Sequence, residues 1–319
     1  MSSKGIGMSN LPNLKYGRIC RKGIDFNIMI VGSTGLGKTS FINGLFNINL
    51  LDTTTEKSDF HVSTCTIVEN QFKTNIIITE INNIGDRKNN DNCWRPIIKY
   101  VHDSYTDFWN KEQENVRDLI SDKRVHLCFY FLEPNIDFIR PADLLTMKEI
   151  SKYCNLVPVV SKSDLLNENE KQEAFDFLRN IFEENNILLF EEEKPERGKL
   201  SNFTPPFFII SPDDISEHTR KYPWGVLDIR NFVTNDLYRL RDQLINKNII
   251  ELIRRTEDFY DMFRATLLYE YVDTQASKEL NKELKLFGLS EEIEDEYKMI
   301  KEMKARILEK KEVLNITKE

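Results

Sequence analysis

The chain has 319 residues, of which 40% are hydrophobic and 30% charged, a composition typical of a folded globular protein rather than a disordered one. This length suits one large α/β domain with an extension, or two ordinary domains. The net charge of -8 disfavours a protein that binds nucleic acid in general, because binding a polyanion requires a basic face.

Residues 1–22 form a polar tail that ends in four basic side chains, Lys15, Arg18, Arg21 and Lys22. Two interpretations stay open for this cluster: a solvated lead-in to the first strand, or a weak attraction to an anionic membrane surface or a partner. The tail lacks the apolar segment of a signal peptide, and the chain has no run of 18 apolar residues. The sequence therefore predicts neither a signal peptide nor a membrane span.

The cysteines of the chain are odd in number, scattered and without CxxC spacing. This pattern indicates free thiols in the reducing cytosol, so we expect a cytoplasmic protein. The five residues are Cys20, Cys65, Cys93, Cys128 and Cys154.

A glycine-rich segment follows the apolar run 26–31 and fills the pattern GxxxxGK[ST]. The pattern predicts a strand, a phosphate-binding loop and a helix whose first backbone N–H groups converge on phosphate oxygens. Lys38 would bridge the β- and γ-phosphates, and the Thr39 hydroxyl would bind Mg²⁺. A glycine-rich turn without a ligand is the alternative. The candidate nucleotide-binding residues here are Gly32, Ser33, Thr34, Gly35, Leu36, Gly37, Lys38, Thr39 and Ser40.

The chain between residues 51 and 80 contains a second candidate ligand for the metal, Glu80. Residues 51–61 are polar and include Thr53 to Thr55, as expected of a loop that a γ-phosphate orders through Mg²⁺. The β-rich runs 64–69 and 75–79 predict a hairpin. Glu80 follows the second run, at the strand end where a P-loop protein needs a carboxylate to hold Mg²⁺ through water.

From residue 93 onward, helical periodicity alternates with continuous apolar runs that are typical of buried strands. Together with the first strand and the hairpin, this order predicts an α/β fold of the P-loop NTPase (Ras-like GTPase) class, with a doubly wound, mostly parallel sheet of about six strands. The predicted elements are helix 93–119, strand 125–132, helix 141–154, strand 156–160, helix 165–184, surface loop 191–206 and strand 207–211.

Strand 156–160 ends at Ser161-Lys162-Ser163-Asp164, which matches the pattern [NTS]-K-x-D. In guanine-specific P-loop proteins the Asp carboxylate accepts hydrogen bonds from the ring N–H and the exocyclic amine, and the Lys stem lies over the purine. Adenine offers no such pair of donors, so the carboxylate would stay unpaired, which enforces specificity. Lys162 and Asp164 are therefore predicted to bind the base of GTP or GDP, in a pocket that the end of strand 207–211 completes.

Two further stretches resemble the septin family. One corresponds to the septin segment after the second switch and the other to the septin unique element, in which Tyr-Pro-Trp-Gly is seldom found in other P-loop GTPases. The likeness covers about residues 11–272. The segments that carry it are 92–100 and 220–226 with 237–244, supported by 11–13 and 131–143.

The resemblance implies a structural subunit that joins other septins through two interfaces, one across the nucleotide pocket and one through the N- and C-terminal helices. Septin rods form filaments on the inner face of a membrane. The implied location is therefore cytoskeletal and peripheral to the membrane, at a septin ring, bud neck or division site, with a role in cell division or a related morphogenetic process. The resemblance also places Arg220 near the base and Trp224 in the nucleotide-side interface.

The chain departs from the septin pattern where septins usually carry Asp-Thr-Pro-Gly, since it has Glu80-Ile81-Asn82-Asn83. Losing the glycine removes a backbone N–H that approaches the γ-phosphate closely and puts a side chain in its place. The switch threonine is expected at Lys57, with Thr53 to Thr55 nearby, and a trans-acting histidine of the family falls at Asp137.

These departures predict a protein that binds nucleotide, holds Mg²⁺ less firmly and hydrolyses GTP slowly or not at all. A regulatory GTPase that cycles between GTP and GDP is the alternative, which an intact Asp-Thr-Pro-Gly would have favoured. A scaffold without nucleotide is a third interpretation. The complete phosphate loop, with Lys38 and Thr39, argues against it.

The C-terminal part is rich in Glu, Lys, Leu and Ile and contains no proline. A single charged surface helix and a short coiled coil both fit, because one heptad position is apolar and its companion is not. The resemblance favours a coiled coil with another septin's tail. The expected organisation is a tail at 1–22, a septin-type GTP-binding domain at 23–245 that includes the unique element, and a helical extension at 246–319. The apolar heptad positions are Leu286, Ile293, Ile300, Ile307 and Leu314.

Overall fold

The computed structural model divides into two compact units, residues 1–261 and 262–319. The predictions for Lys15 to Lys22, Thr53 to Thr55, Lys57, Asn83 and the heptad positions after Leu286 lie outside the described residues. The described residues are 23–48, 50, 60–69, 72–82, 84–86, 90, 92–114, 121–135, 137–191, 204–212, 218–230, 235–286, 298–299 and 301–303.

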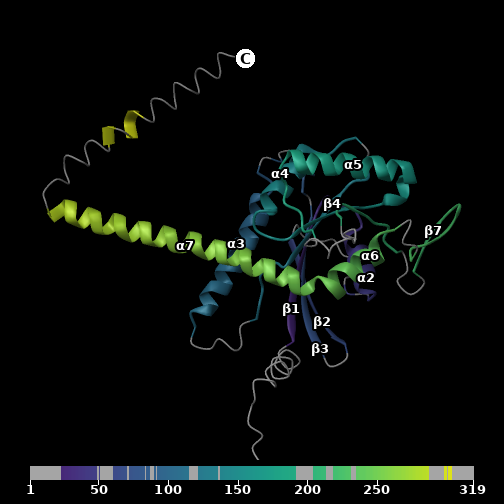
Figure 1. Ribbon diagram of the computed structural model, residues 1–319, viewed down its shortest axis with the longest axis horizontal. Coiled ribbons are helices and arrows are strands. Elements are labelled where there is room, and N and C mark those ends of the chain that lie inside the picture. Colours follow the sequence, from purple (N-terminus) through teal and green to yellow (C-terminus); the bar gives the residue numbers. More distant parts are fainter. Residues whose placement is uncertain are drawn as a thin grey trace, which may run out of the picture. The chain divides into compact units, whose positions relative to one another are not determined.

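The first unit is built on a six-stranded sheet in the order β2-β3-β1-β4-β5-β6 (Figure 1). All neighbouring strands are parallel except β2, which pairs antiparallel with β3, so the predicted doubly wound, mostly parallel sheet is confirmed. The carboxyl ends of the parallel strands meet at one edge of such a sheet. The strands are β1 (Ile24–Val31), β2 (Phe60–Glu69), β3 (Phe72–Ile81), β4 (Leu127–Leu132), β5 (Leu156–Val160) and β6 (Phe207–Phe208).

Several strands differ in length from their predictions. The hairpin strands β2 and β3 are longer than the runs 64–69 and 75–79, because pairing continues from Phe60 opposite Ile81 to Glu69 opposite Phe72. Strand β6 is shorter than 207–211, although the Ile209 N–H still donates to the Val160 carbonyl at 2.9 Å.

Helices connect the strands, and a two-stranded hairpin of β7 (Thr219–Tyr222) and β8 (Gly225–Asp228) precedes α6. Among the described helices, none is both long and apolar enough to cross a membrane. The helices are α2 (Lys38–Phe46), α3 (Arg95–Glu112), α4 (Pro141–Ile150), the 3₁₀ turn η3 (Ser163–Leu165), α5 (Glu168–Glu184), α6 (Leu237–Arg241), the π-helical η4 (Asp242–Lys247) and α7 (Ile249–Leu286).

Local signals explain where several helices begin. Helix α4 begins at Pro141, whose fixed φ suits a first helical position. Helix α5 begins three residues later than predicted because Asn167 caps it: the Asn167 N–H donates to Glu170 in a capping box. Helix α3 is shorter at both ends than the predicted 93–119, and α4 ends at Ile150 instead of Cys154.

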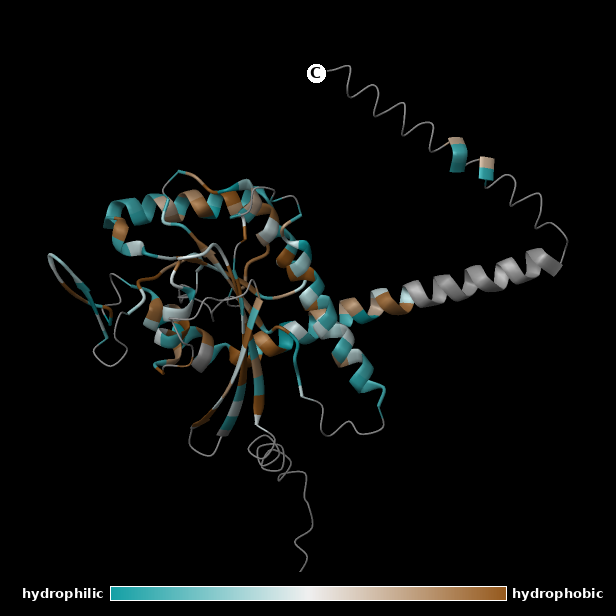
Figure 2. Ribbon diagram, turned by 180° about the vertical axis from the view of Figure 1, so that it is seen from behind, coloured by the Kyte–Doolittle hydropathy of each residue, from teal (hydrophilic) through white to brown (hydrophobic). Residues whose placement is uncertain are grey.

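The core lies between the sheet and its helices. Figure 2 shows hydrophobic residues in the central strands and hydrophobic alternating with hydrophilic residues along the flanking helices. All residues of β4 are buried, which explains its continuous apolar run. Phe41 of α2 makes edge-to-face contacts with Phe129 and Phe131 at ring distances of 5.0 and 5.1 Å, so the helix that follows the phosphate loop is anchored on β4.

A polar network at the amino ends of the central strands includes Asp122, Arg124 and His126. The Arg124 guanidinium donates to Asp122 at 2.6 Å and lies 3.9 Å from the Phe108 ring centre. The Asn27 N–H donates to Nδ1 of the fully buried His126 at 2.9 Å. Burial opposes ionisation of Asp122, but the His126 ring, with Nε2 3.4 Å from the carboxylate, and the hydrogen bonds from Arg124 outweigh it and hold the pKa of this carboxyl well below its ordinary value.

Replacing Asp122 by Asn is expected to lower the free energy of unfolding at pH 7 by about 3 kcal/mol or more, because it leaves the buried Arg124 charge without its partner. Since folding lowers the pKa, Asp122 stabilises the protein fully above its unfolded pKa, near 3.8, and this contribution is lost as the pH falls below it. Urea unfolding at a series of pH values from about 3 to 7 measures this contribution. The difference in free energy of unfolding between Asp122→Asn and the wild type should become smaller as the pH falls. A difference that is constant with pH would contradict this account, and the exposed Asp258→Asn is the control.

Candidate nucleotide-binding site

The predicted phosphate loop joins the end of β1 to α2, and its glycines have distinct reasons to be glycine. Gly35 and Gly37 have φ angles of 80° and 77°, in the left-handed region that other residues rarely adopt. A Cβ on Gly32 would lie 2.8 Å from the Phe131 Cβ, so only glycine lets β1 and β4 approach here. A Cβ on Gly35 would meet nothing within 4 Å, so this part of the loop has room for a ligand.

Lys38 is buried at the start of α2, with 5% of its surface exposed. Its Nζ donates to the Gly32 carbonyl at 2.9 Å and to the Ser33 carbonyl at 2.5 Å. The ammonium is therefore held at the Gly32–Ser33 end of the loop. A positive charge in this place suits the β- and γ-phosphates of a nucleotide.

The two predicted Mg²⁺ residues lie together, although they come from different elements. The Thr39 hydroxyl donates to Oε1 of Glu80 at 3.2 Å. Glu80 is next to last in β3 and only 1% exposed. A hydroxyl and a carboxylate are oxygen ligands that Mg²⁺ prefers, so these residues fit the metal. No cluster of three or more His, Cys, Asp or Glu suited to a metal occurs among the described residues.

The predicted base-reading segment lies at the end of β5. Lys162 has a left-handed φ of 51° and is exposed, and the Ser163 N–H donates to the Ile209 carbonyl at 3.2 Å. Within the part of the chain that the structure describes, Oδ1 of Asp164 is buried and has no hydrogen-bond partner. A buried carboxylate oxygen without a donor is costly unless a ligand supplies one. The segment therefore fits a base with N–H donors.

The segment after β6 and the β7–β8 hairpin bring Arg220 near the phosphate loop. A Cβ on Gly37 would lie 3.9 Å from the Ser211 hydroxyl oxygen, so Ser211 borders the loop. Arg220 donates to the Ser211 carbonyl at 3.3 Å. At the tip of the hairpin, Trp224 is 77% exposed and stacks on Tyr222 with ring centres 4.6 Å apart. An exposed tryptophan that stacks on a half-buried tyrosine suits a protein interface.

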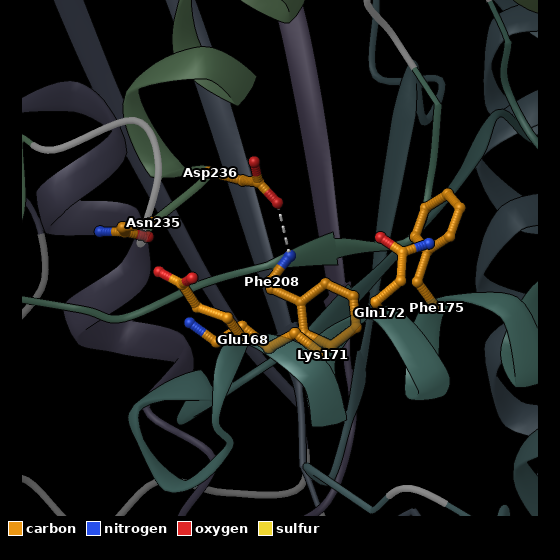
Figure 3. A pocket seen from close by; sticks show the side chains of 7 residues that line it. All are labelled: Glu168, Lys171, Gln172, Phe175, Phe208, Asn235 and Asp236. Carbon is orange, nitrogen blue, oxygen red and sulfur yellow. Dashed lines mark hydrogen bonds between the residues drawn. The ribbon is translucent and has the colours of Figure 1, made fainter.

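A cavity of about 290 Å³ is lined by residues of α5, of β6 and of the segment that precedes α6 (Figure 3). The Phe208 N–H donates to Asp236 at 2.9 Å, so a side chain covers the open edge of β6. Burial raises the pKa of Asp236 and lowers that of Lys171. We assign this cavity a structural role at the sheet edge. Its lining residues are Glu168, Lys171, Gln172, Phe175, Phe208, Asn235 and Asp236.

Two residues at the phosphate loop were not predicted from the sequence. Arg140, which precedes α4, donates through Nη2 to the Ser33 hydroxyl. Asp86 accepts a hydrogen bond from the Thr34 N–H at 2.9 Å. No local motif marks either residue, because both contacts join distant segments. Asp137, at the position of the family's trans-acting histidine, is exposed.

The strand order, the glycine loop and the Lys38, Thr39 and Glu80 arrangement define a P-loop nucleotide-binding protein. A septin family model matches residues 22–279. The chain belongs to the septin family.

Individual relatives agree with this assignment. "Cell division control protein 3" of Encephalitozoon cuniculi (strain GB-M1) is 38% identical over 98% of this chain and 94% of its own length. "Septin-2B" of Xenopus tropicalis is 31% identical over 95% and 91%. The crystal structure of a septin GTPase domain from Chlamydomonas reinhardtii superposes with a TM-score of 0.59, at 22% identity over 76% of this chain and 98% of that one, which shows a shared fold.

Proposed function

We propose that this protein binds GTP or GDP as a structural subunit of septin rods and filaments during cell division or a related morphogenetic process. The buried Oδ1 of Asp164, which has no hydrogen-bond partner among the described residues, is the observation that carries the proposal. Guanine supplies the N–H donors that this carboxylate needs. The phosphates would lie on the loop with Lys38, and Thr39 and Glu80 would hold Mg²⁺. Ser40 and Arg220 complete the proposed nucleotide-binding set.

Hydrolysis is proposed to be slow or absent. Support comes from the sequence Glu80-Ile81-Asn82-Asn83, in which asparagine replaces the glycine that septins usually have. A bound Mg²⁺ would supply charge neutralisation at the phosphates. Glu80 is longer by one methylene than the usual aspartate, and its carboxylate already accepts the Thr39 hydroxyl, so the metal would be held less firmly.

Assembly and location are proposed from the relatives. Two of them are named cell division control proteins, from Encephalitozoon cuniculi and Saccharomyces cerevisiae. We propose contacts with other septins through a nucleotide-side surface that includes Trp224, and through the terminal helices, with residues 246–319 as a coiled-coil extension of the domain 23–245. The site of action would be a septin ring, bud neck or division site, with residues 15–22 against an anionic membrane.

The test is to purify the full chain under native conditions, denature it and identify the released nucleotide by chromatography. Stoichiometric GTP is expected if hydrolysis is slow. Stoichiometric GDP would support nucleotide binding but would require a turnover assay, and rates like those of hydrolysing GTPases would overturn the slow-hydrolysis proposal. No released nucleotide, and no binding when GTP and Mg²⁺ are added, would overturn nucleotide binding.

A further inference from the structure

We propose that Arg140 recognises the terminal phosphate of GTP and that Asp86 competes with this phosphate for the same end of the loop. Together the two residues would set the preference of the site for GTP over GDP. The inference rests on the proposed function, because it requires a guanine nucleotide on the phosphate loop.

The position of Lys38 identifies which end of the loop receives the terminal phosphate. This lysine reaches the β- and γ-phosphates in P-loop proteins, and here its Nζ lies against the Gly32 and Ser33 carbonyls. Arg140 donates to the Ser33 hydroxyl, although the two residues are 107 positions apart. Arg140 therefore adds a second positive charge at the γ-phosphate end.

Neighbouring side chains hold the Arg140 guanidinium in place. Its Nε donates to Asp143 at 2.8 Å and its Nη2 to the same carboxylate at 3.2 Å. Asp143 is buried and also accepts the Tyr130 hydroxyl at 2.8 Å. Such a fixed, bidentate guanidinium loses little conformational freedom when it binds a further anion.

One nitrogen of Arg140 is directed at exposed carboxylates. Nη1 lies 3.5 Å from Asp86 and 3.7 Å from Glu133, both longer than a normal N–H···O hydrogen bond. This nitrogen therefore pairs with the two carboxylates by charge alone. A phosphate oxygen within hydrogen-bond distance would be a stronger partner for Nη1 than carboxylates at 3.5 and 3.7 Å, because it would accept a charge-assisted hydrogen bond.

Asp86 contacts the loop itself. Its Oδ2 accepts the Thr34 N–H at 2.9 Å, and backbone N–H groups of this loop are the donors that bind phosphate. A carboxylate on such a donor competes with a phosphate oxygen for it, and its charge repels the γ-phosphate. GDP has no γ-phosphate, so the competition weakens the binding of GTP only.

The experiment compares the affinities of GTPγS and GDP, with Mg²⁺, by isothermal titration calorimetry of nucleotide-free full-length protein. Arg140→Gln should lower the GTPγS-over-GDP preference by about tenfold or more, the value of one charge-assisted hydrogen bond. Asp86→Asn should raise that preference. Arg179→Gln is the matched control, because the Arg179 side chain is 25% exposed against 24% for Arg140 and also pairs with carboxylates.

The outcomes that would overturn the roles of Arg140 and Asp86 are distinct from one another. Equal weakening of GTPγS and GDP by Arg140→Gln, or an unchanged preference in Asp86→Asn, would overturn the inference. If Arg140→Gln fails to fold because Asp143 loses its partner, Arg140→Lys replaces it. Lysine keeps the charge but lacks the planar fork that Arg140 spreads over Asp143 and Ser33, so Arg140→Lys is also expected to lower the preference. A wild-type preference in Arg140→Lys would therefore also overturn the inference. A wild-type protein that binds neither nucleotide would instead overturn the proposed function.

Discussion

Replacing Lys38 by Met is expected to weaken the binding of both GTPγS and GDP by about a hundredfold or more. Lysine and methionine have similar unbranched stems, so methionine fills the buried position without a large cavity, and the principal loss is the charge. Two charge-assisted hydrogen bonds to phosphate, each worth about 1.5–3 kcal/mol, account for the expected effect. Calorimetry with both nucleotides measures it.

The control for this variant is Lys152→Met. Lys152 follows α4, pairs with Glu149 at 2.6 Å and is 47% exposed, so its replacement should leave both affinities unchanged. The wild-type Lys38 Nζ also donates to two loop carbonyls, and methionine loses both hydrogen bonds. Circular dichroism and thermal unfolding therefore establish whether Lys38→Met keeps the fold. A folded Lys38→Met protein that binds nucleotide as tightly as the wild type would refute the assignment of the phosphate loop.

Replacing Asp164 by Asn is expected to lower GDP affinity by about a thousandfold and to create affinity for xanthosine diphosphate. The carboxylate accepts from the ring N–H and the exocyclic amine of guanine, whereas an asparagine presents an amide N–H₂ that repels the amine. Xanthine has a carbonyl oxygen in place of that amine, so it accepts the new donor. Competition between the two diphosphates for a fluorescent nucleotide measures the exchange.

The gain of xanthosine diphosphate binding separates base recognition from a structural role. Loss of GDP binding without this gain would mean that Asp164 supports the fold instead of reading the base. The exposed Asp176→Asn on α5 is the control and should keep the preference for GDP.

Local patterns were sufficient to predict much of the fold and most of the proposed site. Glycine spacing after an apolar run predicts a strand, loop and helix, because the left-handed φ angles at Gly35 and Gly37 are a property of the backbone itself. Continuous apolar runs predict the buried strands β4 and β5, because a strand covered on both faces has no polar side. The sequence by itself therefore determined the class of fold and the phosphate loop.

Other features depend on which segments the topology brings together. The Thr39–Glu80 and Arg140–Ser33 contacts join residues 41 and 107 positions apart, and no periodicity encodes such distances. The length of β2 and β3 follows from cross-strand pairing, and the burial of Asp164 Oδ1 follows from the packing around it. Only the tertiary structure decided these contacts, strand lengths and the burial of Asp164. Hydrogen bonds and burial depend on the positions of atoms whose residues are far apart in the chain.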